Sequence, residues 1–263
     1  MKRLLLLGIP ALLVACADGT TPTQPASQAA SYSGQPSFAV ASDLSAMNWR
    51  VYNINTAAPK LWDINKAQSL DAGGVQFPFQ TSTTGGDWVG TGWWTVYLFT
   101  NYNRDLTNKI ISADVEVADV TNTPVFFNRS NTPNDAYVRL VFKSAEGNWD
   151  PNDYWWSTED NSLILSTTTA GKLSISTADC SKWSNVGGKN ACDTTVPWTY
   201  NDGVTIQTLS VSPHDGFLDA LKNVKEIGLS FGRYGGYASG VAVTGGTAAF
   251  QLHSFTVDPI VTP

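Results

Sequence analysis

The sequence has little charge, little histidine and few of the residues that long helices use. Only 14% of its 263 residues are Asp, Glu, Lys or Arg, and 16 basic residues stand against 22 acidic ones. Such a chain lacks the basic patch that neutralises nucleic-acid phosphates, so we expect no nucleic-acid partner. The acidic balance also disfavours a strongly polyanionic ligand. A Lys/Glu-rich helical bundle is not expected either.

Several catalytic and metal-binding motifs are absent from the sequence. The two histidines, His214 and His253, belong to no metal-ligand cluster, and no C-x-x-C pair occurs. A Gly-rich phosphate loop and a nucleophile elbow are missing as well. We therefore expect no cofactor, apart from the candidate calcium ion described below.

The N-terminus carries an export signal. Two basic residues precede an apolar run, Leu4 to Leu13, that is too short to span a bilayer as a mature helix. The run Leu13-Val14-Ala15-Cys16 resembles the lipobox of bacterial lipoproteins, whose cysteine is acylated after cleavage. This resemblance implies a signal peptide at 1–15, a lipidated Cys16 and contact with the membrane through the lipid anchor alone. The alternative is an ordinary signal peptide cleaved nearby.

The residues after Cys16 indicate where the protein is sorted and how it is tethered. The residue after Cys16 is Ala17 and not Asp. This resembles the pattern of lipoproteins that are sorted to the outer membrane of two-membrane bacteria. The prediction is an exported protein, lipid-anchored at the outer membrane or cell surface. Residues 16–42 have almost no large apolar side chain, so we expect a flexible tether. Residues 43–258 then form a single domain.

The three cysteines also fit export. If Cys16 is acylated, Cys180 and Cys192 remain, and they flank a Ser/Asn/Gly-rich segment. An even pair in an oxidising compartment predicts one disulfide that closes this loop. The alternative is two free thiols.

Alternation with a period of two predicts an all-β domain. Apolar, β-branched and aromatic residues alternate with polar ones in segments separated by Gly, Asn, Asp, Pro and Thr. These segments are 49–54, 93–100, 111–117, 136–143, 163–166, 172–176 and 247–257. One short α-helix is expected near residues 213–223, because Ser212 can cap it, Pro213 fits its first turn and Asp215 completes a capping box. The fold class is a two-sheet antiparallel jelly roll or related β-sandwich.

The C-terminal half resembles carbohydrate-binding modules. Residues Val224–Gly232, Gly240–Val243 and Gly246–Val257 look like the closing strands of carbohydrate-binding-module-like jelly rolls in exported bacterial proteins. The segments Asp153–Ser157 and Trp183–Lys189 have a similar texture. The resemblance covers residues 90–257 and implies contact with a polysaccharide or oligosaccharide.

Aromatic residues are the first candidate site. The chain has ten tryptophans, nine tyrosines and eleven phenylalanines, and indole and phenol rings stack on the flat C–H faces of sugars. Neighbours on a strand point to opposite faces, so one ring of Trp93-Trp94 and one of Trp155-Trp156 should leave the core. The predicted ligand-binding residues are Trp88, Trp94, Trp149, Tyr154 and Trp156. The alternative is that all these rings fill the core or cap loops.

Oxygen ligands in one loop form the second candidate site. Asp150, Asn152 and Asp153 offer hard oxygens of the kind that Ca²⁺ takes, and the prediction is a structural calcium ion. The spacing is not that of an EF-hand. The same residues also suit an ordinary turn.

A carboxylate strip is the third candidate, and it is catalytic. Asp114, Glu116 and Asp119 are spaced like the E-x-D-x-x-E strand of a retaining glycoside-hydrolase family built on a jelly roll, with the residue types exchanged. The alternative is a solvent-facing strip on a half-buried strand. The triplet Gln251-Leu252-His253 is similar to the Q-I-H of jelly-roll alginate lyases, whose companion motifs are absent here.

Three functions follow from the sequence. The first is a surface lipoprotein that binds a polysaccharide by aromatic stacking, with no catalytic residues. The second is a jelly-roll glycoside hydrolase or polysaccharide lyase, and the third is a structural protein that meets other proteins. The sequence leaves the glycan and the oligomeric state open.

Overall fold

The computed structural model describes residues 48–55, 61–70, 73–81, 92–128, 136–144, 150–165, 170–201, 205–233 and 239–260. The predicted signal peptide at 1–15, the lipidated Cys16 and the tether at 16–42 lie outside the described residues. No helix of the described ranges is both long and apolar enough to span a bilayer.

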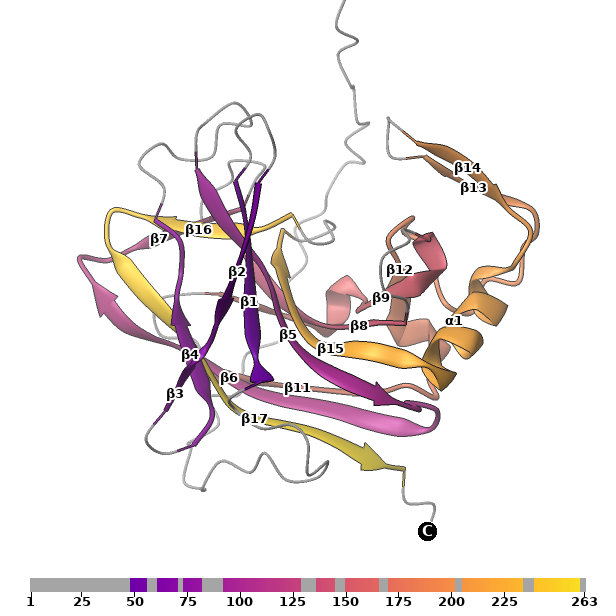
Figure 1. Cartoon of the computed structure of the whole chain (residues 1–263), viewed down its shortest axis with the longest axis horizontal. Coiled ribbons are helices and arrows are strands. Elements are labelled where there is room, and N and C mark those ends of the chain that lie inside the picture. Colours follow the sequence, from indigo (N-terminus) through magenta and orange to yellow (C-terminus); the bar gives the residue numbers. More distant parts are fainter. Residues whose placement is uncertain are drawn as a thin grey trace, which may run out of the picture.

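Two antiparallel sheets and a hairpin make up the fold (Figure 1). The ten-stranded sheet, here the large sheet, has the order β12-β9-β8-β15-β5-β1-β2, with β10 beside β8 and with β16 beside β5 and β7. Its strands are β1 (Arg50–Asn55), β2 (Leu61–Lys66), β5 (Trp93–Arg104), β7 (Val125–Asn128), β8 (Tyr137–Lys143), β9 (Tyr154–Ser157), β10 (Ser162–Ile164), β12 (Trp183–Asn185), β15 (Val224–Gly232) and β16 (Val241–Thr244).

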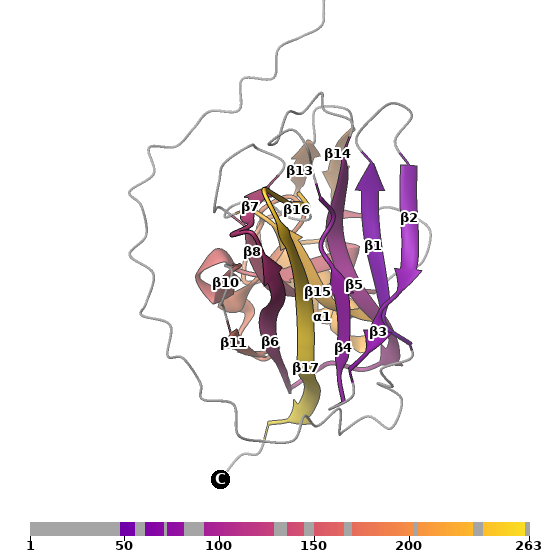
Figure 2. The ribbon, with the colours of Figure 1, turned by 90° about the vertical axis from the view of Figure 1, so that its left-hand side faces the viewer.

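The five-stranded sheet, here the small sheet, has the order β11-β6-β17-β4-β3, and Figure 2 shows β6, β17 and β4 side by side. Its strands are β3 (Gln68–Ser69), β4 (Val75–Pro78), β6 (Lys109–Thr121), β11 (Ala170–Ser176) and β17 (Thr247–Pro259). The long pairing of β6 with β17 shifts register twice, between Thr247 and Ala249 and between Leu252 and Ser254. Such shifts mark bulges that bend the strands.

The main core lies between the two sheets. Phe250 on β17 packs against Phe77 on β4, with ring centroids 5.4 Å apart, and against Phe231 on β15 at 4.9 Å. All three rings are buried. Interlocking large rings join the sheets because aromatic pairs combine a large buried area with favourable edge-to-face geometry.

One helix and one hairpin lie beside the β12 edge of the large sheet (Figure 1). Helix α1 (Pro213–Lys222) begins where Ser212 Oγ accepts a hydrogen bond from the Asp215 amide at 3.0 Å. The hairpin pairs β13 (Trp198–Asn201) with β14 (Ile206–Leu209). Three 3₁₀ turns complete the described elements, η2 (Pro151–Asp153), η3 (Glu159–Asn161) and η4 (Cys180–Lys182).

The predicted all-β sandwich, the short helix and the disulfide are confirmed. Cys180 and Cys192 are bonded, and α1 starts with the predicted cap. The period-two segments all correspond to strands, although β5, β6 and β17 run a few residues beyond their predicted ends. The sequence reasoning missed the short strands β2, β3, β4 and β7 and the hairpin.

Candidate functional site

The face of the large sheet that points away from the small sheet, here the outer face, carries its own cluster of rings. Along β8 and β9, Leu140, Phe142 and Trp155 belong to the main core, whereas Val141 and Trp156 belong to a separate cluster. This is the expected alternation of side chains on a strand. The outer cluster consists of Phe99, Val141 and Trp156, with Tyr52, Tyr97, Tyr154 and Val186 packed against it.

The rings of the outer cluster stack in pairs. Tyr97 lies on Phe99 with centroids 4.7 Å apart and planes 24° apart, and Tyr154 lies on Trp156 at 5.9 Å and 18°. Tyr52 meets the first pair edge to face. Phe99 and Trp156 are buried, and the three tyrosines are half-buried. The partly accessible rings of this cluster are therefore phenols, which combine an apolar body with a polar tip.

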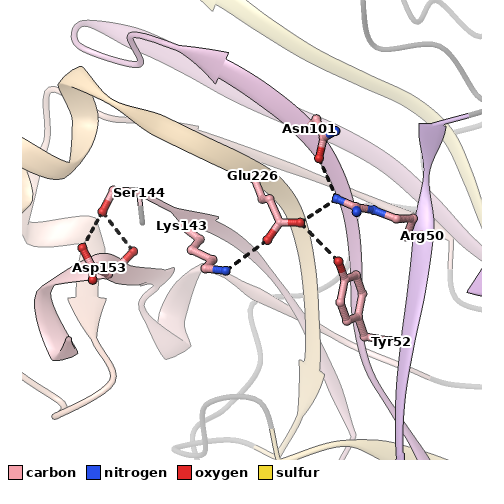
Figure 3. A network of polar contacts seen from close by, with 7 residues as sticks. All are labelled: Arg50, Tyr52, Asn101, Lys143, Ser144, Asp153 and Glu226. Carbon is pink, nitrogen blue, oxygen red and sulfur yellow. Dashed lines mark hydrogen bonds and ion pairs between the residues drawn. The ribbon is translucent and has the colours of Figure 1, made fainter. Parts of the chain in front are cut away.

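Beside these rings lies a network of charged side chains centred on Glu226 of β15 (Figure 3). Arg50 Nη2 of β1 lies 2.7 Å from Glu226 Oε1, and Lys143 Nζ of β8 lies 3.5 Å from Oε2. The Tyr52 hydroxyl donates to Oε1 at 3.2 Å, and Arg50 also donates to Asn101 Oδ1 at 2.6 Å. Four strands thus bring one carboxylate, two cations, a phenol and an amide together.

Buried charge is concentrated on this face. Among the described residues, Arg139 and Glu226 are the charged side chains that are buried. Both lie on the outer face, since Arg139 alternates with the core residues of β8 and donates to the Arg233 carbonyl at 2.9 Å. Burying a charge is unfavourable unless it is paired, so proteins do so sparingly and often at functional sites.

Two outer-face tyrosines are held in their protonated form. Burial, followed by the charge of Glu226, raises the pKa of Tyr52 to about 12. Burial also raises the pKa of Tyr97, with Tyr154 and Glu226 acting in the same direction. At neutral pH both phenols can donate a hydrogen bond, and neither is suited to act as a general base.

The outer face extends to an exposed tryptophan at the edge of the sheet. In the register of β1 with β2, Tyr52 lies opposite Ile64 and Ile54 lies opposite Trp62, and opposite residues of an antiparallel pair share a face. Trp62 is 52% exposed, and it is the most exposed aromatic side chain of the described residues. The sequence reasoning missed it because the segment was not predicted to be a strand.

The five rings predicted to bind a ligand fall into three groups. Trp88 and Trp149 lie outside the described residues. Trp94 and Trp156 are on the outer face but are 2% and 0% exposed, so neither offers the open ring face that stacking on a sugar requires. Tyr154 is half-buried beside the Glu226 network, and Lys143 Nζ lies 5.4 Å from its ring centroid.

The side chains predicted to bind calcium accept hydrogen bonds within the protein, and Asp150 caps the turn η2. Asp150 Oδ1 accepts from the Asn152 amide at 2.8 Å, Asn152 Oδ1 accepts from Asn185 at 3.2 Å, and Asp153 Oδ1 accepts from Ser144 at 2.9 Å. Within the described ranges, no group of three or more His, Cys, Asp and Glu side chains could hold a metal ion. Burial raises the pKa of Asp153, and nearby Asp150 adds to this.

A cavity adjoins the network at this turn. It has a volume of about 580 Å³ and is bounded by η2, α1 and β14. Ser144 and Asp153 line it and are also drawn beside Lys143 in Figure 3. A volume in this range suits a small ligand or part of a larger one.

The three carboxylates of the predicted catalytic strip are not brought into one cleft. On the outer face of the small sheet, Glu116 Oε2 lies 2.9 Å from His253 Nε2, and Asp114 accepts from Ser254 at 2.5 Å. The hollow beside them measures only about 30 Å³. Asp119 has a positive φ of 51° next to a register shift and lines a different hollow of about 200 Å³.

Comparison with known proteins assigns this chain to no family. A scan against protein-family models and a search of curated proteins each found no match to this chain.

Proposed function

We propose that the protein binds a polysaccharide or oligosaccharide across the outer face of the large sheet. The observation that carries the proposal is the exposed indole of Trp62, placed on the same face as Tyr52 and the Glu226 network. A flat ring can stack on one face of a sugar, and the network offers donors and acceptors to its hydroxyls.

The arrangement of the strands supports an extended ligand. The path β2-β1-β5-β15-β8-β9 crosses the sheet from Trp62 to Tyr154. Neighbouring strands lie about 4.8 Å apart, so this path is about 24 Å long, enough for several linked sugar rings. Stacking and neutral hydrogen bonds would supply the attraction, so binding should depend little on salt.

The test is electrophoresis of the purified protein through gels that contain soluble neutral, amino and uronic polysaccharides. We expect retardation by at least one of them, and we expect Trp62→Ala to weaken binding about tenfold, which corresponds to 1.4 kcal/mol. Trp62→Phe should retain part of the affinity. Val120→Ala is the control, because Val120 is 36% exposed on β6 of the small sheet.

The proposal fails if no polysaccharide retards the protein. It also fails if Trp62→Ala binds as the parent protein does. Because Trp62 is half-exposed on an edge strand, the substitution should leave the melting temperature nearly unchanged, so lost binding would not reflect unfolding.

Cleavage of the same glycan is the second candidate function. The arrangement of Tyr52, Arg50 and Glu226 favours cleavage. A phenol can give a proton to the leaving group, and a neighbouring cation can stabilise negative charge on the sugar. A phenol with a raised pKa would act as a proton donor there. A reducing-end assay on the retained polysaccharide separates the two functions, because a binding protein releases no new ends.

The proposed cellular setting rests on the sequence. The lipobox-like Cys16 and the signal at 1–15 support an exported protein anchored by lipid at the outer membrane or cell surface. Labelling of cells with a radioactive fatty acid should mark the protein, and Cys16→Ser should abolish the label.

A further inference from the structure

The cavity of about 580 Å³ lies at the strand ends on the side of the large sheet remote from Trp62, because Ser144 follows β8, Asp153 precedes β9 and Lys225 lies at the start of β15. Trp62 is on β2, one edge of the large sheet, whereas the cavity is walled by α1, η2 and β14 near the β9 and β12 edge. Figure 1 shows the helix and hairpin on the side away from β2. Ser144 and Asp153 of the cavity are chain neighbours of the outer-face residues Lys143 and Tyr154, so a glycan chain that leaves the outer face at this end of the strands would reach the cavity.

The cavity wall has more carboxylates, which accept hydrogen bonds, than cations, which donate them. Asp150, Asp153 and Asp219 line it, against one lining cation, Lys225, and Lys222 just outside the lining, whose Nζ lies 2.9 Å from Asp219 Oδ1. Ionised carboxylates only accept hydrogen bonds, and they repel a ligand that carries its own anion. The remaining polar lining consists of amides and hydroxyls, namely Ser144, Asn152, Gln207, Thr208, Ser210 and Asn223.

We propose that this cavity is a subsite for one sugar unit of the bound glycan, and that it takes an uncharged or ammonium-bearing sugar in preference to a uronate. The inference rests on the proposed glycan binding and specifies the class of sugar. A hydroxyl or ammonium group donates to the carboxylates, whereas a uronate would bring a fourth carboxylate against three.

The test fills the cavity without disturbing the core. Thr208 is exposed on β14 and lines the cavity, so Thr208→Trp should occupy part of its volume. Ser174 is exposed on β11 of the small sheet and is absent from the cavity lining, so Ser174→Trp is the control. The probes are hexasaccharides of glucose, mannose, xylose, glucosamine and galacturonate, measured by titration calorimetry with the purified full chain.

We expect an uncharged or glucosamine hexasaccharide to bind about tenfold more tightly than the galacturonate one. Thr208→Trp should lower that affinity about tenfold, and Ser174→Trp should leave it within about twofold. A second variant, Asp219→Lys, alters an exposed side chain that lines the cavity, and it should weaken glucosamine binding and improve galacturonate binding.

The outcomes separate the two proposals. If Trp62→Ala lowers the affinity but Thr208→Trp and Asp219→Lys do not, the outer face binds glycan and the subsite is overturned. Tighter binding of the galacturonate hexasaccharide overturns the stated preference. If none of the probes binds, the glycan-binding function and the subsite are both overturned.

Discussion

The outer faces of the two sheets differ in how deeply their charged side chains are buried. On the small sheet, polar side chains of neighbouring strands pair with one another close to the solvent. Glu116, for example, pairs with His253, and the Glu116 side chain is 42% exposed. On the large sheet Glu226 is only 11% exposed and lies among two cations and stacked rings. Alternating polar residues are what any solvated sheet face contains. A carboxylate buried among aromatic side chains is unusual, and it is the stronger indication of a site.

The comparison also explains why carboxylate spacing alone cannot identify a catalytic site. Asp114 and Glu116 alternate with buried valines, as a half-solvated strand requires, and that alternation alone produces their spacing. The spacing of these carboxylates does not indicate whether a cleft lies above the strand. The hollow of about 30 Å³ beside them is too small for a sugar ring.

The largest expected effect tests whether the rings of the outer face are structural. Trp155 and Trp156 are both fully buried, one in the core and one on the outer face. Each substitution by alanine should therefore lower the free energy of unfolding by about 3–5 kcal/mol in urea denaturation. An unchanged stability for Trp156→Ala would show that this ring is open to solvent and would return it to the list of ligand-binding residues.

A smaller effect compares one carboxylate on each face. Glu226→Gln leaves the mostly buried Lys143 and the partly exposed Arg50 without their counter-charge, so we expect a loss of about 2 kcal/mol. Glu116→Gln removes one partner of an exposed pair, and the loss should be less than about 1 kcal/mol. Equal losses in urea denaturation would remove the distinction between the two faces.

The same pair of variants sharpens the functional contrast. Glu116→Gln should leave polysaccharide retardation unchanged, because its strand lies on the opposite sheet from Trp62. Glu226→Gln should weaken retardation by up to about tenfold, since it disturbs Arg50 and Tyr52 directly. Loss of binding in Glu116→Gln alone would move the site to the small sheet.

The sequence predicted the sandwich because its signal is local. Alternation along single segments such as 111–117 needs no knowledge of partners, and the cap of α1 lies within four consecutive residues. The strand β2 was overlooked although the apolar Trp62 and Ile64 alternate with the polar Asp63 and Asn65, a pattern that could have identified it.

The site was only partly predictable, because burial depends on which face is covered. Tyr154 was predicted to bind a ligand and is half-buried beside the Glu226 network, whereas the predicted Trp94 is buried and the exposed Trp62 was not considered. Arg50 and Glu226 are 176 positions apart in the sequence, and only the pairing of β1, β5 and β15 brings them together. No pattern in a single sequence predicts such a long-range contact.

The smallest effect is alkaline destabilisation, and it should arise mainly from the large sheet. The strands of the small sheet contain no tyrosine, whereas the pKa of Tyr52 is raised to about 12 from 10. Below pH 10 this phenol is protonated in the folded and the unfolded chain alike. Between pH 10 and 12 the unfolded chain loses the proton and the folded one keeps it, so the free energy of unfolding falls as the pH rises.

Tyr52→Phe should therefore reduce the slope of this fall in urea titrations between pH 9 and 12, while His253→Gln on the small sheet should leave it unchanged. Tyr97 and Tyr102 also have raised pKa values, so part of the slope should persist in Tyr52→Phe. If the slope is the same in Tyr52→Phe and in the parent protein, the Tyr52 hydroxyl is accessible to water and is not held in the Glu226 network. The outer face would then be as solvated as that of the small sheet, and the physical contrast between the two faces would be lost.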